Sequence, residues 1–545
     1  IFLDDIVNGS VYANTIKNNQ YGIKISNCKN LTLRLNQLQN NSRSFGIYGT
    51  SIEHFTTNDI QWSNLIDGNP TYYIKNQENV VISPSSHPNI GYLGVVNSTN
   101  VVISDLNLSA NGQGLLLAYV NDFKIRNLTI SNCWVGIQLN HVTKGELIMT
   151  EIVDSEYAMI IRASNFINIT GCEITNNTIG VSLSYPANND VIVNENNFED
   201  NILGVVIFPY IYNTKFFHNN FVDNSIHAIL LCSYGVDWDN GYPSGGNYWS
   251  DYNGTDHYNG VYQNIKGCDG IGDIPYAIEE YYQNVDRYPL MGPWTREGLN
   301  VEVPISDEYR LLFENVTSSG VTTLQELNEG PNPPTGFKLA TQPPLYYNIT
   351  TTAKYSGNIL ISIKYNDENL TEHEEKNLKL MQWNIDSWTD ITTEVDIENN
   401  FIYGRTTHLS LFAIMTTTVL KHEIQVIDIS LSNPSPSVNE SITISVKLAN
   451  LGNYTETFTV LVNYTRLRDP LIGSQTITLA PGETAVLNFT WTPNMPGRYR
   501  ILAYTSEIPE DIEPSNNRRE ITIYVRSQAS TDGSSSMGFR RCLLK

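Results

Sequence analysis

The sequence predicts an all-β protein in which a parallel β-helix is followed by two β-sandwich domains. A small residue recurs at one phase, with gaps of 22 residues and then 24, and a second column of small or polar residues repeats every 22. Each period holds three short runs of β-forming residues separated by Asn, Gly and Ser turns. Beyond residue 298 this rhythm gives way to longer alternating strands. The two columns are Gly114, Gly136, Ala158, Gly180, Gly204, Ala228 and Asn111, Cys133, Ser155, Asn177.

Both columns have a physical reason in a solenoid. Successive rungs stack about 4.8 Å apart, so residues one period apart lie above one another. A small residue lets the chain turn a corner without collision, and an Asn amide bonds to the next rung while tolerating left-handed turn geometry. We therefore expect each column to form a straight line in space.

Composition restricts the partners and the compartment. The 545 residues carry 33 basic and 56 acidic side chains, a net charge of −23, which disfavours nucleic acid and anionic membranes as partners. The chain is rich in Tyr and has no apolar run long enough to span a membrane. We expect an extracellular surface protein, processed or truncated at its start because it begins at Ile1 without Met or a basic leader.

Sequons and cysteines agree with secretion. Six cysteines are few, and we expect Cys28, Cys133 and Cys172 to be buried inside rungs, while Cys232 and Cys268 form the best candidate disulfide. Sixteen Asn-x-Ser/Thr sequons predict a glycoprotein. The predicted glycosylation sites are Asn30, Asn97, Asn127, Asn253, Asn315, Asn348, Asn369, Asn439, Asn453, Asn463 and Asn488.

The first ninety residues carry the repeat with an interruption. Gly22 and Gly46 lie 24 residues apart and read as neighbouring rungs. Residues 51–91 are less regular and predict one enlarged rung with a loop over 67–70. An uncapped first rung would expose strand edges, so we expect association with other copies as a homo-oligomer, filament or surface layer.

Two quoted stretches support a family resemblance. DGNPTYYIKNQ and the run from YLGVVNSTN to CWVGIQL resemble the NosD-type right-handed β-helix repeats of archaeal surface proteins over roughly residues 1–295. These repeats belong to a broader group of β-helices associated with carbohydrate binding and sugar hydrolysis. The resemblance implies a right-handed β-helix, and it leaves open lyases, epimerases and inert scaffolds.

The segment 236–297 is rich in Asp, Gly and aromatic residues. Its GNYWSDY, DGIGD and DRYPLM resemble the C-terminal signature of the same family. Carboxylates held on tight Gly-rich turns are suitable ligands for Ca²⁺. The alternative interpretation is that these Asp residues only stabilise the turns. We expect structural calcium, and we expect the aromatic residues to cap the open end of the helix, with a sugar platform as the alternative. The expected ligands are Asp269 and Asp273 first, then Asp237, Asp239 and Asp251, and the aromatic residues are Tyr248, Trp249, Tyr252, Tyr276, Tyr288 and Trp294.

Two sandwiches follow. Alternating strands such as YNITTTAKYSGNILISIKY predict the first, whose charged insert around His373 reads as a solvated face rather than a metal cluster. SVNESITISVKLANLGNYTETFTVLVNY and the following strands resemble a CARDB-type immunoglobulin-like adhesion domain, with Trp491 as its core aromatic. The acidic loop ending SNN departs from that family's pattern. The predicted boundaries are 1–235 for the β-helix, 236–297 for the cap, 298–420 and 421–526 for the sandwiches, and 527–545 for a flexible tail.

No catalytic set emerges from the sequence. His218, Asp223 and His227 are close in sequence and are compatible with an acid–base group, but we favour the interpretation that they lie on a solvated turn. The favoured function is a non-enzymatic extracellular structural or adhesion glycoprotein, a rigid rod with sandwich spacers. The alternative is a polysaccharide-binding or polysaccharide-modifying β-helix, which would need paired carboxylates on one face.

Overall fold

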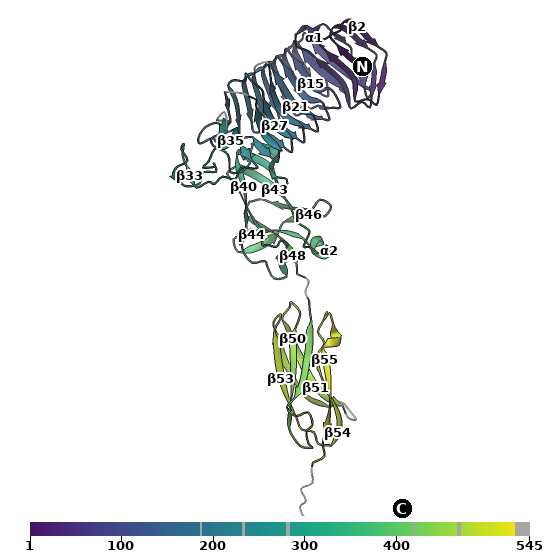
Figure 1. Cartoon of the computed structure of the whole chain (residues 1–545), viewed down its shortest axis with the longest axis vertical. Helices are drawn as coiled ribbons and strands as arrows, with labels where there is room; N and C mark the ends of the chain where they lie inside the picture. Colours follow the sequence, from purple (N-terminus) through teal and green to yellow (C-terminus); the bar gives the residue numbers. More distant parts are fainter. Residues whose placement is uncertain (186–187, 232–234, 280–283, 419–420, 466–469, 529–545) are drawn as a thin grey trace, which may run out of the picture. The chain divides into compact units, whose positions relative to one another are not determined.

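The computed structural model describes residues 1–545 except 186–187, 232–234, 280–283, 419–420, 466–469 and 529–545. The chain is all-β, as predicted, and divides into two compact units, 1–416 and 417–545. The first unit holds the β-helix and one sandwich, and the second unit holds the other sandwich (Figure 1). In the described part of the chain, helices are too short and too polar to cross a bilayer.

The main solenoid winds three short strands into each rung, and equivalent strands stack in parallel to give three sheets. Leu115 pairs with Ile137, and Ile137 with Met159, so the register advances by 22 residues per rung. These side chains point inward into one continuous apolar core. The first sheet contains β10 (Asn69–Lys75), β12 (Tyr92–Val96), β15 (Gln113–Ala118), β18 (Val135–Asn140), β21 (Tyr157–Arg162), β24 (Ile179–Ser184), β27 (Leu203–Ile207) and β30 (Ile226–Leu230). The second contains β11 (Glu78–Ile82), β13 (Thr99–Ser104), β16 (Asn121–Arg126), β19 (Thr143–Ile148), β22 (Asn165–Thr170), β25 (Asn189–Asn194), β28 (Thr214–Phe217) and β31 (Val236–Asp237). The third contains β14 (Asn107–Ser109), β17 (Thr129–Ser131), β20 (Glu151–Val153), β23 (Glu173–Thr175), β26 (Asn197–Glu199), β29 (Asn220–Val222) and β32 (Tyr248–Trp249).

The predicted column of small residues is confirmed from Gly114 to Gly204 and wrong at its last member. A Cβ added to Gly136 would lie 2.5 Å from Ile152 Cγ2 and 2.6 Å from the Ala158 carbonyl oxygen, so the corner has room for little more than hydrogen. The register is 24 residues in the rung from Gly180 to Gly204 and 23 in the next, so Ala228 pairs with Val205 inside the strand. The corner above Gly204 is formed by His227, whose carbonyl group faces it.

The polar column does bond from rung to rung. The Cys133 amide donates to Ser155 Oγ at 3.2 Å, and the Ser155 amide donates to Asn177 Oδ1 at 3.0 Å. Asn177 in turn donates to Asn201 Oδ1 at 3.0 Å, and Asn201 to Asn224 Oδ1 at 3.0 Å. Buried backbone amides at this corner are thereby satisfied by a side chain of the next rung.

Residues before β10 form a separate, shorter stack rather than one enlarged rung, which corrects the prediction for 51–91. Ile66 pairs with Asn69 in an antiparallel turn, so the chain reverses between the stacks. Gly22 faces Ser44, not Gly46, because Tyr21 pairs with Arg43 and the rung has 22 residues. This N-terminal stack contains β1 (Phe2–Asp4), β4 (Tyr21–Ser26), β7 (Arg43–Tyr48); β2 (Val7–Tyr12), β5 (Lys29–Arg34), β8 (Asp59–Ile60); β3 (Thr15–Lys17), β6 (Gln37–Gln39), β9 (Leu65–Ile66); and α1 (Glu53–Thr56).

The N-terminal stack packs against the outer face of β12 and β15. Tyr92 and Leu116 belong to its apolar core, and the Tyr92 ring meets Phe45 edge-on at 4.8 Å. Gln113 Nε2 donates to the Ile47 carbonyl at 2.9 Å. Apolar burial and amide bonds therefore fix the angle between the stacks, and a polar groove lies where they meet.

The cap and the first sandwich follow the last rungs. Trp249 stacks on Phe221 and on Tyr276, each at 4.4 Å, so two of the predicted capping aromatics do cover the end of the core. The cap contains β33 (Tyr258–Asn259), β34 (Ile265–Lys266), β35 (Tyr276–Glu279) and β36 (Asn284–Asp286). The sandwich contains β37 (Trp294–Thr295), β40 (Gly320–Leu327), β41 (Phe337–Leu339), β42 (Tyr346–Thr351), β48 (Leu411–Thr417), β44 (Lys379–Asn384) and β45 (Ser387–Asp390) in one sheet, β38 (Gly298–Ser306), β39 (Tyr309–Ser318), β43 (Lys354–Lys364), β47 (Phe401–Thr406) and β46 (Thr392–Asp396) in the other, and α2 (Glu372–Lys376).

The second unit is a sandwich of its own. Trp491 is buried in its core with Tyr499, as predicted. One sheet contains β49 (Ile424–Leu431), β50 (Ile442–Asn450) and β53 (Thr484–Trp491), and the other contains β52 (Leu471–Leu479), β51 (Glu456–Thr465), β54 (Gly497–Thr505) and β55 (Arg518–Val525), preceded by the short helix η2 (Pro514–Asn516).

Candidate functional site

The predicted calcium ligands Asp269 and Asp273 shape loops of the cap. The Asp273 carboxylate accepts hydrogen bonds from the amides of His257 at 2.8 Å and Tyr258 at 3.0 Å. Asp269 accepts from the Ile271 amide at 3.1 Å. Such side-chain acceptors stabilise tight turns, so this pair has a structural use without an ion, and calcium binding here stays a prediction.

The other three predicted ligands lie apart. Asp239 is buried and bonds to the Arg287 guanidinium at 2.7 and 2.9 Å. Burial opposes its ionisation most strongly, but hydrogen bonds from Arg287 and from the Gly241 amide, together with the Arg287 charge, lower its pKa overall. Asp251 lies 3.2 Å from His227 Nε2, and exposed Asp237 is the neighbour of Lys215 across the strand ladder at the end of the second sheet. The structure does not bring the five carboxylates to one point.

Asp286 is a buried carboxylate of the cap that was not among the predicted ligands. It is fully buried, and its oxygens accept from the amides of Asn247 at 2.7 Å and Tyr288 at 3.0 Å and from Trp249 Nε1 at 3.0 Å. Burial raises its pKa to about 7. The signal for it was the DRYPLM motif, in which the acid and Arg287 precede the mostly apolar run from Tyr288 to Met291.

Asp286 ends a second polar column. The Asn196 amide donates to Asn219 Oδ1 at 3.2 Å, the Asn219 amide to Asn247 Oδ1 at 3.2 Å, and the Asn247 amide to Asp286. Gly246 lies directly against the Asp286 carboxylate, where an added Cβ would collide with it. A chain segment of the cap thus continues the solenoid's own bonding pattern.

The described residues contain one group of three metal-type side chains, Glu199, Asp200 and Asp307. It lies where the solenoid meets the first sandwich, and Arg310 of the sandwich forms an ion pair with buried Glu199. Burial and the neighbouring Asp307 raise the pKa of Asp200 to about 6. The Asp307 amide also donates to Asp223 Oδ2 at 2.8 Å. This cluster serves a domain contact.

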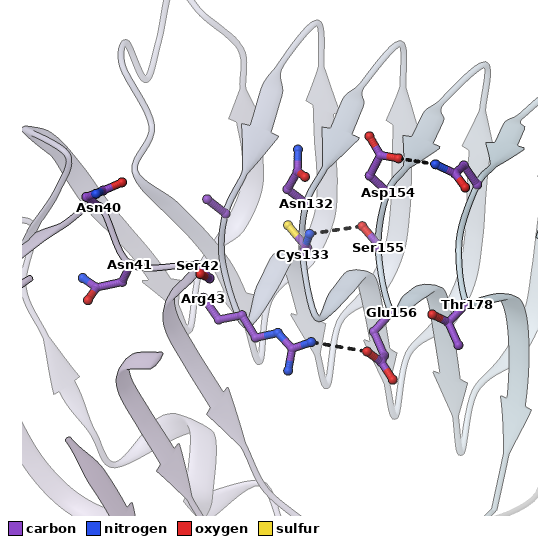
Figure 2. Close-up of a pocket in the computed structure, with 12 residues that line it drawn as sticks. Asn40, Asn41, Ser42, Arg43, Asn132, Cys133, Asp154, Ser155, Glu156 and Thr178 are labelled. Atoms are coloured by element: carbon purple, nitrogen blue, oxygen red, sulfur yellow. Dashed lines mark hydrogen bonds and ion pairs between the residues drawn. The ribbon is translucent and has the colours of Figure 1, made fainter. Parts of the chain in front are cut away.

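A polar groove of about 670 Å³ lies between the two stacks (Figure 2). Its walls come from the link between β6 and β7 on one side and from one corner of successive main rungs on the other. Asn132 and Asp154 line up along the rungs, and both take left-handed backbone angles, with φ of 55° and 54°. The groove residues are Asn40, Asn41, Ser42, Arg43, Ala110, Asn132, Cys133, Asp154, Ser155, Glu156, Asn176 and Thr178.

Two contacts order the groove. Arg43 of the N-terminal stack reaches across to Glu156 Oε2 at 3.3 Å and also donates to the Tyr21 hydroxyl. Asn176 Nδ2 donates to Asp154 Oδ1 at 2.6 Å. Burial raises the pKa of the Cys133 thiol to about 11, so it is neutral. The groove offers amides, hydroxyls and carboxylates, which suit a hydroxyl-rich ligand.

The predicted acid–base residues, cysteines and glycosylation sites lie at several places in the structure. His218 stacks on Trp294 at 3.6 Å and bonds to the Ser244 carbonyl, while His227 pairs with Asp251, so the structure does not bring the predicted acid–base group into one site. Cys28, Cys133 and Cys172 are buried, as predicted. The disulfide partner Cys232 and the His373 side chain lie outside the described residues. Of the predicted glycosylation sites, those exposed are Asn30, Asn97, Asn127, Asn253, Asn369, Asn439, Asn453 and Asn488.

Two family models match the chain. Residues 65–254 match the family described as periplasmic copper-binding protein (NosD), and residues 423–519 match CARDB. Copper favours imidazole and sulfur ligands, whereas the metal-type triad among the described residues consists of carboxylates. Among the described residues, no group of three side chains therefore supplies the imidazole and sulfur ligands that copper, the metal in the family's name, favours.

Solved structures resemble parts of the chain. The CARDB domain of a Pyrococcus furiosus protein, in complex with di-metal ions, is 27% identical, covers 21% of this chain and all of its own, and has a TM-score of 0.19. A β-glucosidase from Erythrobacter marinus is 18% identical over 19% of this chain, with a TM-score of 0.17. A Listeria innocua β-glucosidase in complex with glucose is 14% identical over 20%, with a TM-score of 0.16. This chain spans 15% and 17% of the two glucosidases. No curated protein matches the chain.

Proposed function

The chain is a NosD-like parallel β-helix protein with a C-terminal CARDB domain, and we propose that it is an extracellular structural and adhesion glycoprotein. In this role the β-helix is a rigid rod, and the sandwiches are spacers or adhesive heads. The observation that carries the proposal is the unbroken bonding from solenoid to cap to first sandwich. Eight of the predicted glycosylation sites are exposed, which is compatible with glycosylation of such a surface.

The first sandwich is tied to the solenoid by several kinds of contact. Asn220 exchanges two hydrogen bonds with the Trp294 backbone, at 2.6 and 3.0 Å. The Tyr248 hydroxyl donates to the Ile305 carbonyl at 2.9 Å. Buried Glu199 forms an ion pair with Arg310, and removal of either partner of such a buried pair strongly destabilises a protein. Together these contacts resist bending at a point where a flexible linker would otherwise allow it.

The proposal is tested by adhesion and assembly measurements on the full chain. Beads coated with the protein are expected to bind to cells of the producing organism, whereas beads coated with an unrelated acidic protein are not. Light scattering and electron microscopy with and without calcium measure self-association. If the beads do not bind to the cells, the adhesion role is refuted. If the protein is strictly monomeric with and without calcium, assembly into a layer or filament is refuted.

A second candidate function, polysaccharide binding without catalysis, is favoured by the groove between the stacks. Its size lies in the range of small-ligand sites, and its lining is rich in hydrogen-bonding groups. We expect Asp154→Ala to weaken binding of soluble cell-surface polysaccharide at least tenfold. The matched control is Asp122→Ala, an aspartate of β16 with φ of 56° that lies outside the groove. Equal binding by both variants would remove the groove as the site.

A further inference from the structure

The second sheet of the solenoid carries a separate hollow of about 510 Å³. It lies over β22, β25, β28 and β31, away from the junction of the two stacks. Its lining combines an aromatic ring and an aliphatic side chain with amide, carboxylate and ammonium groups. The residues that supply these groups are Phe166, Asn168, Asp190, Ile192, Lys215 and Asp237.

The surface chemistry of this sheet changes along the solenoid. On earlier rungs two lysines each meet an anion one rung away: Lys144 Nζ lies 2.5 Å from Asp122, and Lys124 Nζ lies 2.9 Å from Glu146. The same two columns then continue into Phe166 and, two rungs after Glu146, into Ile192. Alternating charges are thus replaced by apolar side chains at the hollow.

Phe166 occupies a position that suits another residue type. Its φ is 56°, in the left-handed region, where bulky side chains are strained and Asn or Asp are favoured. Asp122 and Asp190 occupy the same column with φ of 56° and 54°. The Phe166 side chain is also 63% exposed, so core packing does not offset the strain. Met149 shares the left-handed angle and the exposure, so what distinguishes Phe166 is its place in the lining of the hollow.

The polar groups flank the apolar ones along the axis. Asn168 stacks below Ile192, and Lys215 and Asp237 follow on the next two rungs. Three rung steps of about 4.8 Å give the hollow a length of about 14 Å. Two carboxylates against one ammonium group leave it net negative, which disfavours phosphates and other anions.

We propose that this hollow binds a short stretch of a neutral saccharide chain, laid along the solenoid axis. A sugar ring rests its C–H face on Phe166 and Ile192, and its hydroxyls bond to Asn168, Asp190, Lys215 and Asp237. The volume is in the range of small-ligand sites, in which a few polar groups orient a ligand held by apolar contact. The site is independent of the groove between the stacks and of the proposed adhesion role.

The test uses Phe166→Asn in the full chain. Because Asn tolerates φ near +56°, this variant is expected to melt at a higher temperature than the parent and yet to bind saccharide at least tenfold more weakly. The matched control is Met149→Asn, since Met149 is 54% exposed with φ of 49° but lies outside the hollow. It is expected to gain stability and to keep full binding.

The probes are hexasaccharides of glucose, mannose, galactose and N-acetylglucosamine, with polygalacturonate as an anionic counterpart, measured by calorimetry and saturation-transfer NMR. Binding of at least one neutral probe, lost in Phe166→Asn, supports the proposal. Binding of none, or of polygalacturonate alone, overturns it. If Asp154→Ala abolishes neutral binding and Phe166→Asn does not, the saccharide lies in the groove and the hollow is refuted while the second candidate function stands.

Discussion

Local stability of the cap should fall as pH rises, because Asp286 must ionise in a buried site. Burial raises its pKa to about 7 from an ordinary value of 3.8. Since the folded pKa lies above the unfolded one, the stabilising contribution is complete below pH 3.8 and is lost as pH rises through 7. The difference is about three pH units at about 1.4 kcal/mol each, or about 4 kcal/mol.

The assay is hydrogen exchange of the peptide 244–250, corrected for intrinsic rates, at pH 5 and pH 8. Wild-type protection should fall by a large part of that 4 kcal/mol. In Asp286→Asn the slope should vanish, because no carboxylate remains, although protection at pH 5 drops by about 1–3 kcal/mol where the amide faces the Tyr288 N–H. Asp122→Asn, on the exposed solenoid surface, is the control. Equal wild-type protection at both pH values, or a persisting slope in Asp286→Asn, would refute the reasoning.

Three further outcomes follow from the packing. Gly136→Ala should lower the denaturant midpoint, by about 1–3 kcal/mol, because the new Cβ meets Ile152 and a backbone carbonyl; an unchanged midpoint would contradict the tight corner. Asn219→Leu should cost a similar amount by leaving the Asn196 amide unpaired, seen as faster exchange of that amide. Arg310→Ala should leave Glu199 buried and unpaired, costing about 3–5 kcal/mol, and should speed proteolysis between solenoid and sandwich; unchanged cleavage would contradict a locked junction.

Periodicity made the solenoid predictable. Gly114 and Gly136 indicate the solenoid because the corner has no space for a larger side chain, and this requirement repeats with each rung. The predicted corner position of Ala228 was wrong because Ala is also common inside strands. A rung that is shorter by one residue has no signature in the composition of the sequence. The reversal at Ile66 and Asn69 was missed because a hairpin turn and a loop within a rung share the same residues.

The site was less predictable because the meaning of a carboxylate depends on its surroundings. Asp269 and Asp286 look alike in a sequence rich in Asp and Gly, yet one shapes an exposed loop and the other ends a buried column. The groove joins Arg43 to Glu156 across 113 residues, and no local pattern encodes that contact. Exposed Phe166 is distinguished from exposed Met149, which has a similar backbone angle, only by the hollow that Phe166 lines.

The rung-to-rung amide columns bear on how the rod would yield under tension. A pull along the axis loads the three strands of a terminal rung and its corner amides simultaneously, so a rung should detach as a unit rather than strand by strand. Each release would free one rung of 21 to 24 residues, or about 70–85 Å of chain. Stretching would then proceed in steps of similar length, and the molecule would dissipate force in small steps while the rungs behind the break stay wound.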